Sequence, residues 1–281
     1  MLNVLIQMFS YPFLLRAMIV GVLVSLCASL LGVSLVLKRY SMIGDGLSHV
    51  GFGALAVATA VHAAPLAVAI PVVVAAAFLL LRLSESSKVK GDAAIALIST
   101  GALAIGVMAI SFSTGANMDV YNYMFGSILA MSQGDVRLSI ALSAVVLVLY
   151  MLFYPKIFAV TFDETFSLAT GVRVGWYNVL IALLTALTIV LGMRLMGSLL
   201  ISSLVIFPAL TSMRVFQSFR CVVISSACLS IVCFLIGLLL SYAWSTPAGA
   251  SVVCVNIAAY LLFWAFSLVR QRLRRKPMEN A

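Results

Sequence analysis

Residues 38–49 read Lys38-Arg39-Tyr40-Ser41-Met42-Ile43-Gly44-Asp45-Gly46-Leu47-Ser48-His49, so that a basic turn leads into an apolar segment with one carboxylate and one imidazole. Asp45 and His49 are four residues apart, and on a helix they lie on the same face. Of the eight acidic residues in the chain, Asp45 is the one that we expect well inside an apolar span. An ionisable residue in a membrane helix is costly, and it marks a candidate functional site.

The composition indicates an integral membrane protein. Of 281 residues, 64% are hydrophobic and 9% are charged, and the mean hydropathy is +1.21. A soluble domain has about 25% charged residues, and this chain has too few polar residues to cover a soluble body of its size. We expect one transmembrane domain over residues 1–281, with no soluble domain.

The apolar runs predict an all-α, polytopic fold with about eight or nine transmembrane helices. A bilayer core of ~30 Å needs ~20 apolar residues per helix. Nine runs meet this description to within a few residues at each end: 17–37, 44–61, 65–83, 93–113, 137–155, 177–193, 197–213, 222–242 and 249–269.

The distribution of the basic residues predicts the orientation. The net charge is +9, and a basic tail with Arg270, Arg272, Arg274, Arg275 and Lys276 follows the last apolar run. Under the positive-inside rule this tail is cytoplasmic. Counting back places 214–220, 156–173, 82–90 and 38–39 on the same side, and residues 1–15 outside or on the membrane surface. Because no continuous basic stripe exists, we expect no nucleic-acid partner.

The same orientation gives a depth for the candidate pair. If Lys38 and Arg39 lie at the inner surface, Asp45 lies roughly 9 Å and His49 roughly 15 Å into the core, at 1.5 Å per helical residue. A carboxylate oxygen and a neutral imidazole nitrogen are good ligands for Zn²⁺ or Mn²⁺. Alternatively, Asp45 caps the helix and His49 is a hydrogen-bonded core residue. The spacing alone leaves both interpretations open.

Three other features bear on this candidate site. His62, at the outer end of the same segment, and Asp119, in an outside connection, are candidates for a metal access path; an interfacial histidine and a solvated loop carboxylate are their ordinary alternatives. Met196-Gly197 separates two apolar runs, and Pro208 lies within the second. Broken helices at membrane depth are tolerated where they line a cavity or pack on neighbours.

A short amphipathic segment, residues 161–173, lies between the fifth and sixth runs. Asp163 and Glu164 are suited to a helix N-terminus, and Gly171 to a helix end. The segment also carries Phe166 and Leu168, as a cytoplasmic docking element would, although a helix lying on lipid fits equally well.

Known catalytic motifs are missing from the sequence. It has no Gly-x-x-x-x-Gly-Lys-Ser/Thr loop, so the chain does not hydrolyse ATP in that way. It also has no Gly-x-Ser-x-Gly and no His-Glu-x-x-His. We therefore expect that the chain is not an enzyme.

Several segments, in order along the chain, resemble one family of transporters. They are the basic–Gly-Asp-x-x-x-His stretch that ends at His49, then Asp163-Glu164 with Ala169-Thr170-Gly171-Val172, Leu184-Thr185-Ala186-Leu187-Thr188-Ile189, Met196-Gly197-Ser198-Leu199-Leu200, Phe207-Pro208-Ala209, and Thr246-Pro247-Ala248-Gly249-Ala250-Ser251-Val252-Val253. Nearly the whole chain resembles the permease subunits of bacterial zinc/manganese ABC importers (the ABC-3 family), most closely zinc permeases of the ZnuB type.

This resemblance implies a permease fold similar to the cobalamin/iron-chelate type, in the bacterial inner membrane. It implies a homodimer with two cytoplasmic ABC ATPase subunits and an extracytoplasmic metal-binding protein, and no permanently bound cofactor. The transported ion is expected to be Zn²⁺, or alternatively Mn²⁺ or iron, with Asp45 and His49 in contact with it. The coupling helix against the ATPase is expected at residues 161–173, with the roles carried by Asp163, Glu164, Phe166, Leu168, Ala169 and Gly171.

Three other functions compete with this expectation. A permease for an iron chelate or cobalamin would have a wide apolar cavity and no midplane carboxylate–imidazole pair. A secondary transporter driven by protons or sodium would use Asp45 and His49 as a proton relay. A membrane scaffold would transport nothing.

Overall fold

The computed structural model describes residues 12–85, 91–112 and 132–279, and in these ranges every regular element is an α-helix. The helices are α2 (Pro12–Leu37), α3 (Met42–Ala60), α4 (Pro65–Glu85), α5 (Gly91–Phe112), α7 (Gln133–Phe162), α8 (Glu164–Ala169), α9 (Val174–Met196), α10 (Ser198–Met213), α11 (Phe219–Trp244) and α12 (Ala248–Glu279). The all-α prediction is confirmed.

Each of the nine predicted apolar runs coincides with one long helix. Seven of these helices, α2, α4, α5, α7, α9, α11 and α12, are long and apolar enough to cross a membrane. The other two differ for visible reasons, since α10 has only 16 residues and α3 carries Asp45, His49 and four glycines among its 19 residues. The two helices that are least typical of a membrane span therefore lie next to each other at the candidate site.

The helices begin and end largely where local chemistry requires. Ser132 accepts a hydrogen bond from the Asp135 backbone N–H, and the Asp135 carboxylate accepts one from Ser132, which forms a capping box at the start of α7. Gly197 has φ 82°, a backbone conformation that glycine adopts without strain, and it separates α9 from α10. The predicted break at Met196-Gly197 is confirmed, whereas Pro208 lies inside a continuous α10.

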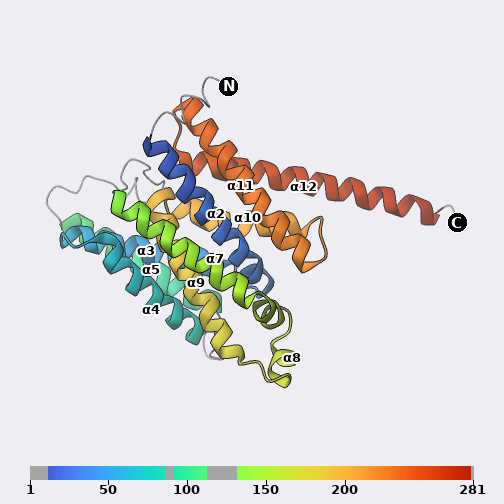
Figure 1. Ribbon diagram of the computed structural model, residues 1–281, viewed down its shortest axis with the longest axis horizontal. Coiled ribbons are helices and arrows are strands. Elements are labelled where there is room, and N and C mark those ends of the chain that lie inside the picture. Colours follow the sequence, from blue (N-terminus) through green and yellow to red (C-terminus); the bar gives the residue numbers. More distant parts are fainter. Residues whose placement is uncertain (1–11, 86–90, 113–131, 280–281) are drawn as a thin grey trace.

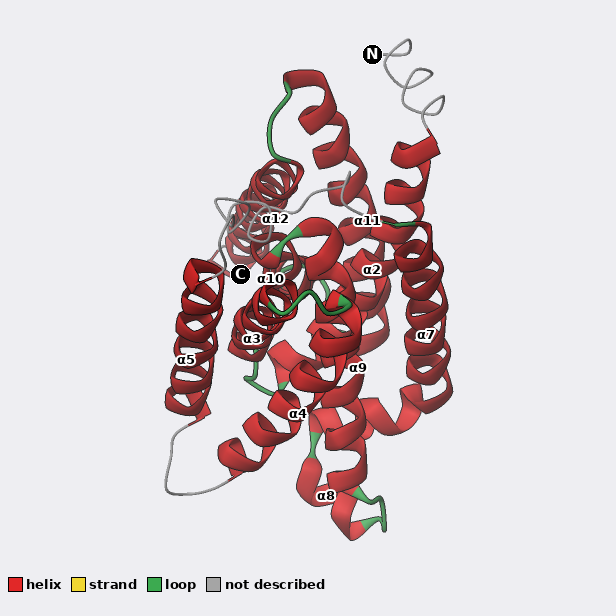
Figure 2. Ribbon diagram, turned by 90° about the vertical axis from the view of Figure 1, so that its left-hand side faces the viewer, coloured by secondary structure: helices red, strands yellow, loops and turns green. Residues whose placement is uncertain are grey.

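Helix α2 lies at the centre of the bundle, and it packs against α7, α9, α10 and α11 (Figure 1). Serine side chains connect it to α11, because Ser226 and Ser230 donate to the carbonyl oxygens of Ser29 and Ser25 at 3.4 and 3.0 Å. In an apolar bundle such interhelical hydrogen bonds and small residues hold helices together. In the two ribbon views α8 lies at one end of the bundle, and α12 extends beyond the other helices in Figure 1 (Figures 1 and 2).

One buried polar residue of α12 bonds within its own helix. The Asn256 side-chain amide donates to the Val252 carbonyl oxygen at 3.0 Å. The carbonyl four residues earlier is within reach of a short polar side chain.

The contact between α2 and α10 depends on Gly32. A Cβ atom at position 32 would lie 1.9 Å from the Val205 carbonyl oxygen, a separation that backbone atoms of two packed helices cannot absorb. We expect Gly32→Ala to lower the free energy of unfolding by about 1–3 kcal/mol, as overpacking does. Thermal unfolding of the detergent-solubilised protein measures this effect.

Gly101→Ala in α5 is the matched control, since a Cβ there meets no atom within 4 Å. Alanine favours a helix over glycine by up to ~1 kcal/mol, so the control should be as stable as the wild type or more so. Equal unfolding temperatures for the two variants would contradict the close α2–α10 packing.

Candidate metal-path site

The candidate site is built on the first half of α3. The helix begins at Met42, with Ser41 as its N-cap residue, so Asp45 is the fourth helical residue rather than the cap. A carboxylate in the first turn interacts favourably with the helix dipole, but the Asp45 carboxylate contacts side chains instead of the free N–H groups. The interpretation of Asp45 as the helix cap is therefore not supported.

Asp45 and His49 are the two accessible residues in the middle part of this helix, between Ile43 and Ala56. His49 Nε2 is 3.6 Å from Asp45 Oδ2, and the two side chains are 29% and 46% exposed. From Ile43 to Ala56, a stretch described throughout, all residues except Asp45 and His49 are buried. A histidine that served only core packing would be enclosed like its neighbours. Here a carboxylate and an imidazole share an opening in an otherwise enclosed stretch of α3.

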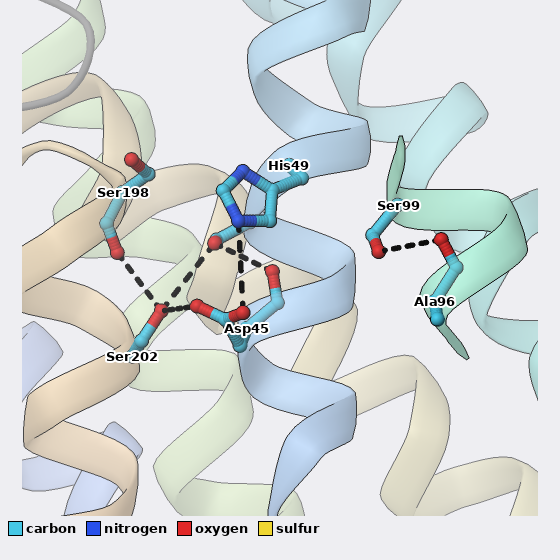
Figure 3. A network of polar contacts seen from close by, with 7 residues as sticks. Asp45, His49, Ala96, Ser99, Ser198 and Ser202 are labelled. Atoms are coloured by element: carbon cyan, nitrogen blue, oxygen red, sulfur yellow. Dashed lines mark hydrogen bonds and ion pairs between the residues drawn. The ribbon is translucent and has the colours of Figure 1, made fainter. Parts of the chain in front are cut away.

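Helix α10 adds one hydroxyl group, that of Ser202, to the pair (Figure 3). Ser202 Oγ lies 3.2 Å from Asp45 Oδ1, 2.9 Å from the Ser198 carbonyl oxygen and 3.3 Å from Ser48 Oγ. Ser48 itself donates to the Asp45 carbonyl oxygen at 2.7 Å. A serine hydroxyl has one proton and two lone pairs, so Ser202 can donate to Asp45 or to Ser198 while its oxygen remains able to accept or to ligate.

The arrangement can bind a divalent cation but does not enclose one. Within the described ranges no group of three or more His, Cys, Asp or Glu side chains comes together. Asp45, His49 and the Ser202 hydroxyl offer a partial set of oxygen and nitrogen donors, and the rest would come from water or from another chain. Structural zinc sites are closed by four protein ligands, whereas this incomplete set is suited to binding an ion that must be released.

Neither proposed access residue joins the pair in the described structure. His62 follows α3 with φ 54° and is exposed. It lies 13 residues beyond His49, which is roughly 20 Å at 1.5 Å per residue. Asp119 lies outside the described residues. The structure therefore leaves both access-path predictions as predictions.

Sequence reasoning missed two serines of α10 at the site, Ser202 with its hydroxyl group and Ser198 with its backbone carbonyl oxygen. Ser198 and Ser202 are four residues apart and share a face of α10 directly after the break at Gly197. That spacing is a usable signal, but pairing it with Asp45, which is 157 positions away from Ser202, requires tertiary structure.

The candidate coupling segment, residues 161–173, forms a short helix as predicted, but the helix α8 covers only Glu164–Ala169. The Asp163 carboxylate caps α8 by accepting the Phe166 N–H at 2.9 Å. Gly171, with φ 80°, follows its end, and its N–H donates to the Leu168 carbonyl oxygen at 3.0 Å. From Glu164 to Ala169 only Ser167 is buried, and Phe166 and Leu168 are 65% and 61% exposed. A short helix is thus held out from the bundle with its apolar side chains uncovered.

Comparison with known proteins identifies the family. The ABC 3 transport family pattern matches residues 10–267. A manganese transport system membrane protein, MntC, of Halalkalibacterium halodurans is 27% identical over 93% of this chain and 89% of its own length. A probable iron transport system membrane protein of Haemophilus influenzae is 30% identical over the full length of both chains.

Solved structures agree with the fold. PsaBC from Streptococcus pneumoniae, in complex with Fab, has a chain that superposes with a TM-score of 0.83 at 26% identity, over 93% of this chain and 94% of that chain. An inward-facing, metal-chelate type ABC transporter superposes with a TM-score of 0.72 at 14% identity over 90% and 85%, which supports the fold alone.

These relatives confirm one part of the resemblance predicted from the sequence and do not support another. The importer family and the permease fold are confirmed, but the relatives described above are named for manganese and iron, so the specific likeness to zinc permeases is not supported by them. The chain belongs to the ABC 3 transport family, as a multi-pass permease subunit of a metal ABC importer.

Proposed function

We propose that this chain carries a divalent first-row metal ion, with Mn²⁺ as the leading candidate, across the bacterial inner membrane in an ATP-driven importer. The observation that carries the proposal is the pair Asp45 and His49, which are the accessible residues of an otherwise buried helical stretch. An ionised Asp45 offsets part of the desolvation of the cation, and a neutral His49 adds affinity.

The choice of Mn²⁺ follows from the donor set. Carboxylate, hydroxyl and water oxygens suit hard ions such as Mn²⁺, whereas thiolates select softer ones. The site offers the Asp45 carboxylate and the Ser202 hydroxyl with a single imidazole, and no cysteine lies among these contacts. The manganese named in relatives such as MntC agrees with this chemistry. Zn²⁺ is the second candidate, because the segments 184–189 and 246–253 resemble zinc permeases.

The proposed assembly has three kinds of component. Two copies of this chain form a homodimer, with the ion path between them and donors from both copies completing the site. Two cytoplasmic ATPase subunits contact α8, and an extracytoplasmic metal-binding protein delivers the ion from the other side. This orientation places the C-terminal basic segment in the cytoplasm, in keeping with the positive-inside rule.

Transport by the reconstituted complex tests the proposed cargo. In vesicles that contain the permease and its ATPase, supplied with the metal-binding protein and ATP, we expect Mn²⁺ to accumulate faster than Zn²⁺ at equal free concentration. An ATPase variant that cannot hydrolyse ATP is the control, and it should give no accumulation.

The competing functions give different results in the same vesicles. Faster Zn²⁺ uptake would replace the leading candidate by the second. Metal uptake driven by a proton or sodium gradient without any ATPase would contradict the proposal in favour of a secondary transporter. Transport of an iron chelate or cobalamin but not of free ions would exclude the role given to Asp45 and His49.

A further inference from the structure

Lys38, at the end of α2, is a buried cation that joins three parts of the chain. Its ammonium group lies 2.7 Å from Glu164 Oε1 of α8 and also donates to Asn178 Oδ1 of α9. The Asn178 amide in turn donates to Glu164 Oε1 at 3.3 Å. These three residues, which we term the Lys38 triad, form a closed set of polar contacts between segments far apart in the sequence.

The burial of Lys38 makes these contacts energetically important. Its side chain is only 6% exposed, whereas that of Glu164 is 50% exposed. A buried charge is costly unless it is paired, and the loss of its partner leaves that cost uncompensated. If α8 moves, Lys38 must therefore either follow Glu164 or lose its ionic partner. The half-exposed Glu164 can move with α8 at much lower cost.

Lys38 of the triad is connected to the candidate metal site by the short backbone segment that joins α2 to α3. Lys38 is followed by a tight turn in which Arg39 has φ 61° and the Tyr40 N–H donates to the Leu35 carbonyl oxygen at 2.8 Å. The Ile43 N–H donates back to the Tyr40 carbonyl oxygen at 3.0 Å, which connects the turn to the start of α3. Asp45 is seven residues after Lys38, so a displacement of Lys38 is passed to Asp45 through a short, hydrogen-bonded segment.

Asn178 of the triad is connected through α9 and α10 to Ser202, whose hydroxyl group lies at the same site. Asn178 lies in the first turns of α9, and α9 continues to Met196. Beyond the break at Gly197, α10 carries Ser202, whose hydroxyl contacts the Asp45 carboxylate. Glu164 thus contacts both chain segments, α2–α3 and α9–α10, that position the groups around the ion.

We propose that the Lys38 triad couples the position of α8 to the geometry of the metal site, with Lys38, Glu164 and Asn178 as positioning residues. The inference rests on the proposed function, in which α8 contacts the ATPase. When the ATPase moves α8, Glu164 pulls on Lys38 and Asn178 together. The distance between α3 and α10 around Asp45 changes as a result, and this change alternates the site between binding and release.

Single substitutions that remove one charge test the coupling. We expect the Lys38→Gln complex to assemble with the ATPase and to retain basal ATP hydrolysis. Glu164 lies on α8 itself, so Glu164→Gln is compared with it per assembled complex. The amount of Mn²⁺ transported per ATP hydrolysed should fall about tenfold, within the usual range of coupling between sites. Lys156→Gln is the matched control, because Lys156 is exposed, and it should behave as the wild type.

The exchanged pair Lys38→Glu/Glu164→Lys separates coupling from simple structural damage. It retains an ion pair between the same two elements and should recover much of the transport lost in the single variants. Unchanged transport per ATP in the assembled Lys38→Gln complex would overturn the proposal. The proposal would also be overturned if the exchanged pair transported no more metal per ATP than the single variants. Failure of the proposed function itself would appear separately, as no metal transport by the wild-type complex.

Discussion

Replacing both Asp45 and His49 with alanine is expected to abolish metal uptake while the complex with the ATPase still assembles. The substitution removes the carboxylate that offsets the charge of the ion and the imidazole that completes the pair, 3.6 Å apart in the structure. Mutation of a residue that only supports a metal ligand costs about 10–100-fold in affinity or activity. The loss of both proposed ligands should therefore reduce uptake by more than ~100-fold.

The double variant needs a control that changes a carboxylate elsewhere. Asp92 is exposed in the first turn of α5, and Asp92→Ala should transport metal at the wild-type rate. Co-purification with the ATPase shows whether the Asp45→Ala/His49→Ala protein is assembled. Undiminished uptake by that assembled variant would remove both residues from the ion path.

The second large effect is expected at the exposed side chains of α8. Phe166→Asp/Leu168→Asp places two charges where an apolar contact with the ATPase is proposed. Hot-spot residues, which cluster near the centre of an interface, cost about 2–4 kcal/mol each when they are truncated. Binding of the ATPase should fall below detection in co-purification, and ATP-driven uptake should be lost with it.

An apolar exchange provides the matched comparison for α8. Phe166→Leu/Leu168→Phe retains the apolar character of both positions and should retain ATPase binding. If the aspartate variant binds the ATPase normally, α8 is not the docking element. A helix that lay on lipid would show that result, together with weaker membrane association of the variant.

The helices were predictable because hydropathy dominates this sequence. Where helix ends differ from the predicted runs, local chemistry is the reason. The run 137–155 becomes α7 from Gln133 to Phe162, since the capping box of Ser132 and Asp135 starts the helix earlier. Pro155 does not end it, because Ile157, Phe158 and Val160 continue the apolar pattern beyond the proline.

Of the candidate site, only the two residues that lie on one helix were predictable from the sequence. Asp45 and His49 belong to one helix, and helical spacing places them together without further information. Ser202 reaches Asp45 only through the packing of α3 on α10, and Lys38 reaches Glu164 only through the position of α8. Neither contact has a signal in spacing. The preference for Mn²⁺ has no signature in α3 alone, because carboxylate and imidazole serve both manganese and zinc. The additional oxygen donor, the Ser202 hydroxyl, comes from α10.

The most direct test of the site is the electron spin echo of Mn²⁺ bound to the assembled complex, with ATP hydrolysis blocked and the permease labelled with ¹⁵N-histidine. The chain has two histidines, His49 and His62, so the assignment needs only two variants. We predict a modulation from a ligating imidazole nitrogen that is retained in His62→Gln and lost in His49→Gln. A modulation that persists in His49→Gln, or none in the wild-type complex with Mn²⁺ bound, would contradict the assignment of His49 to the ion path.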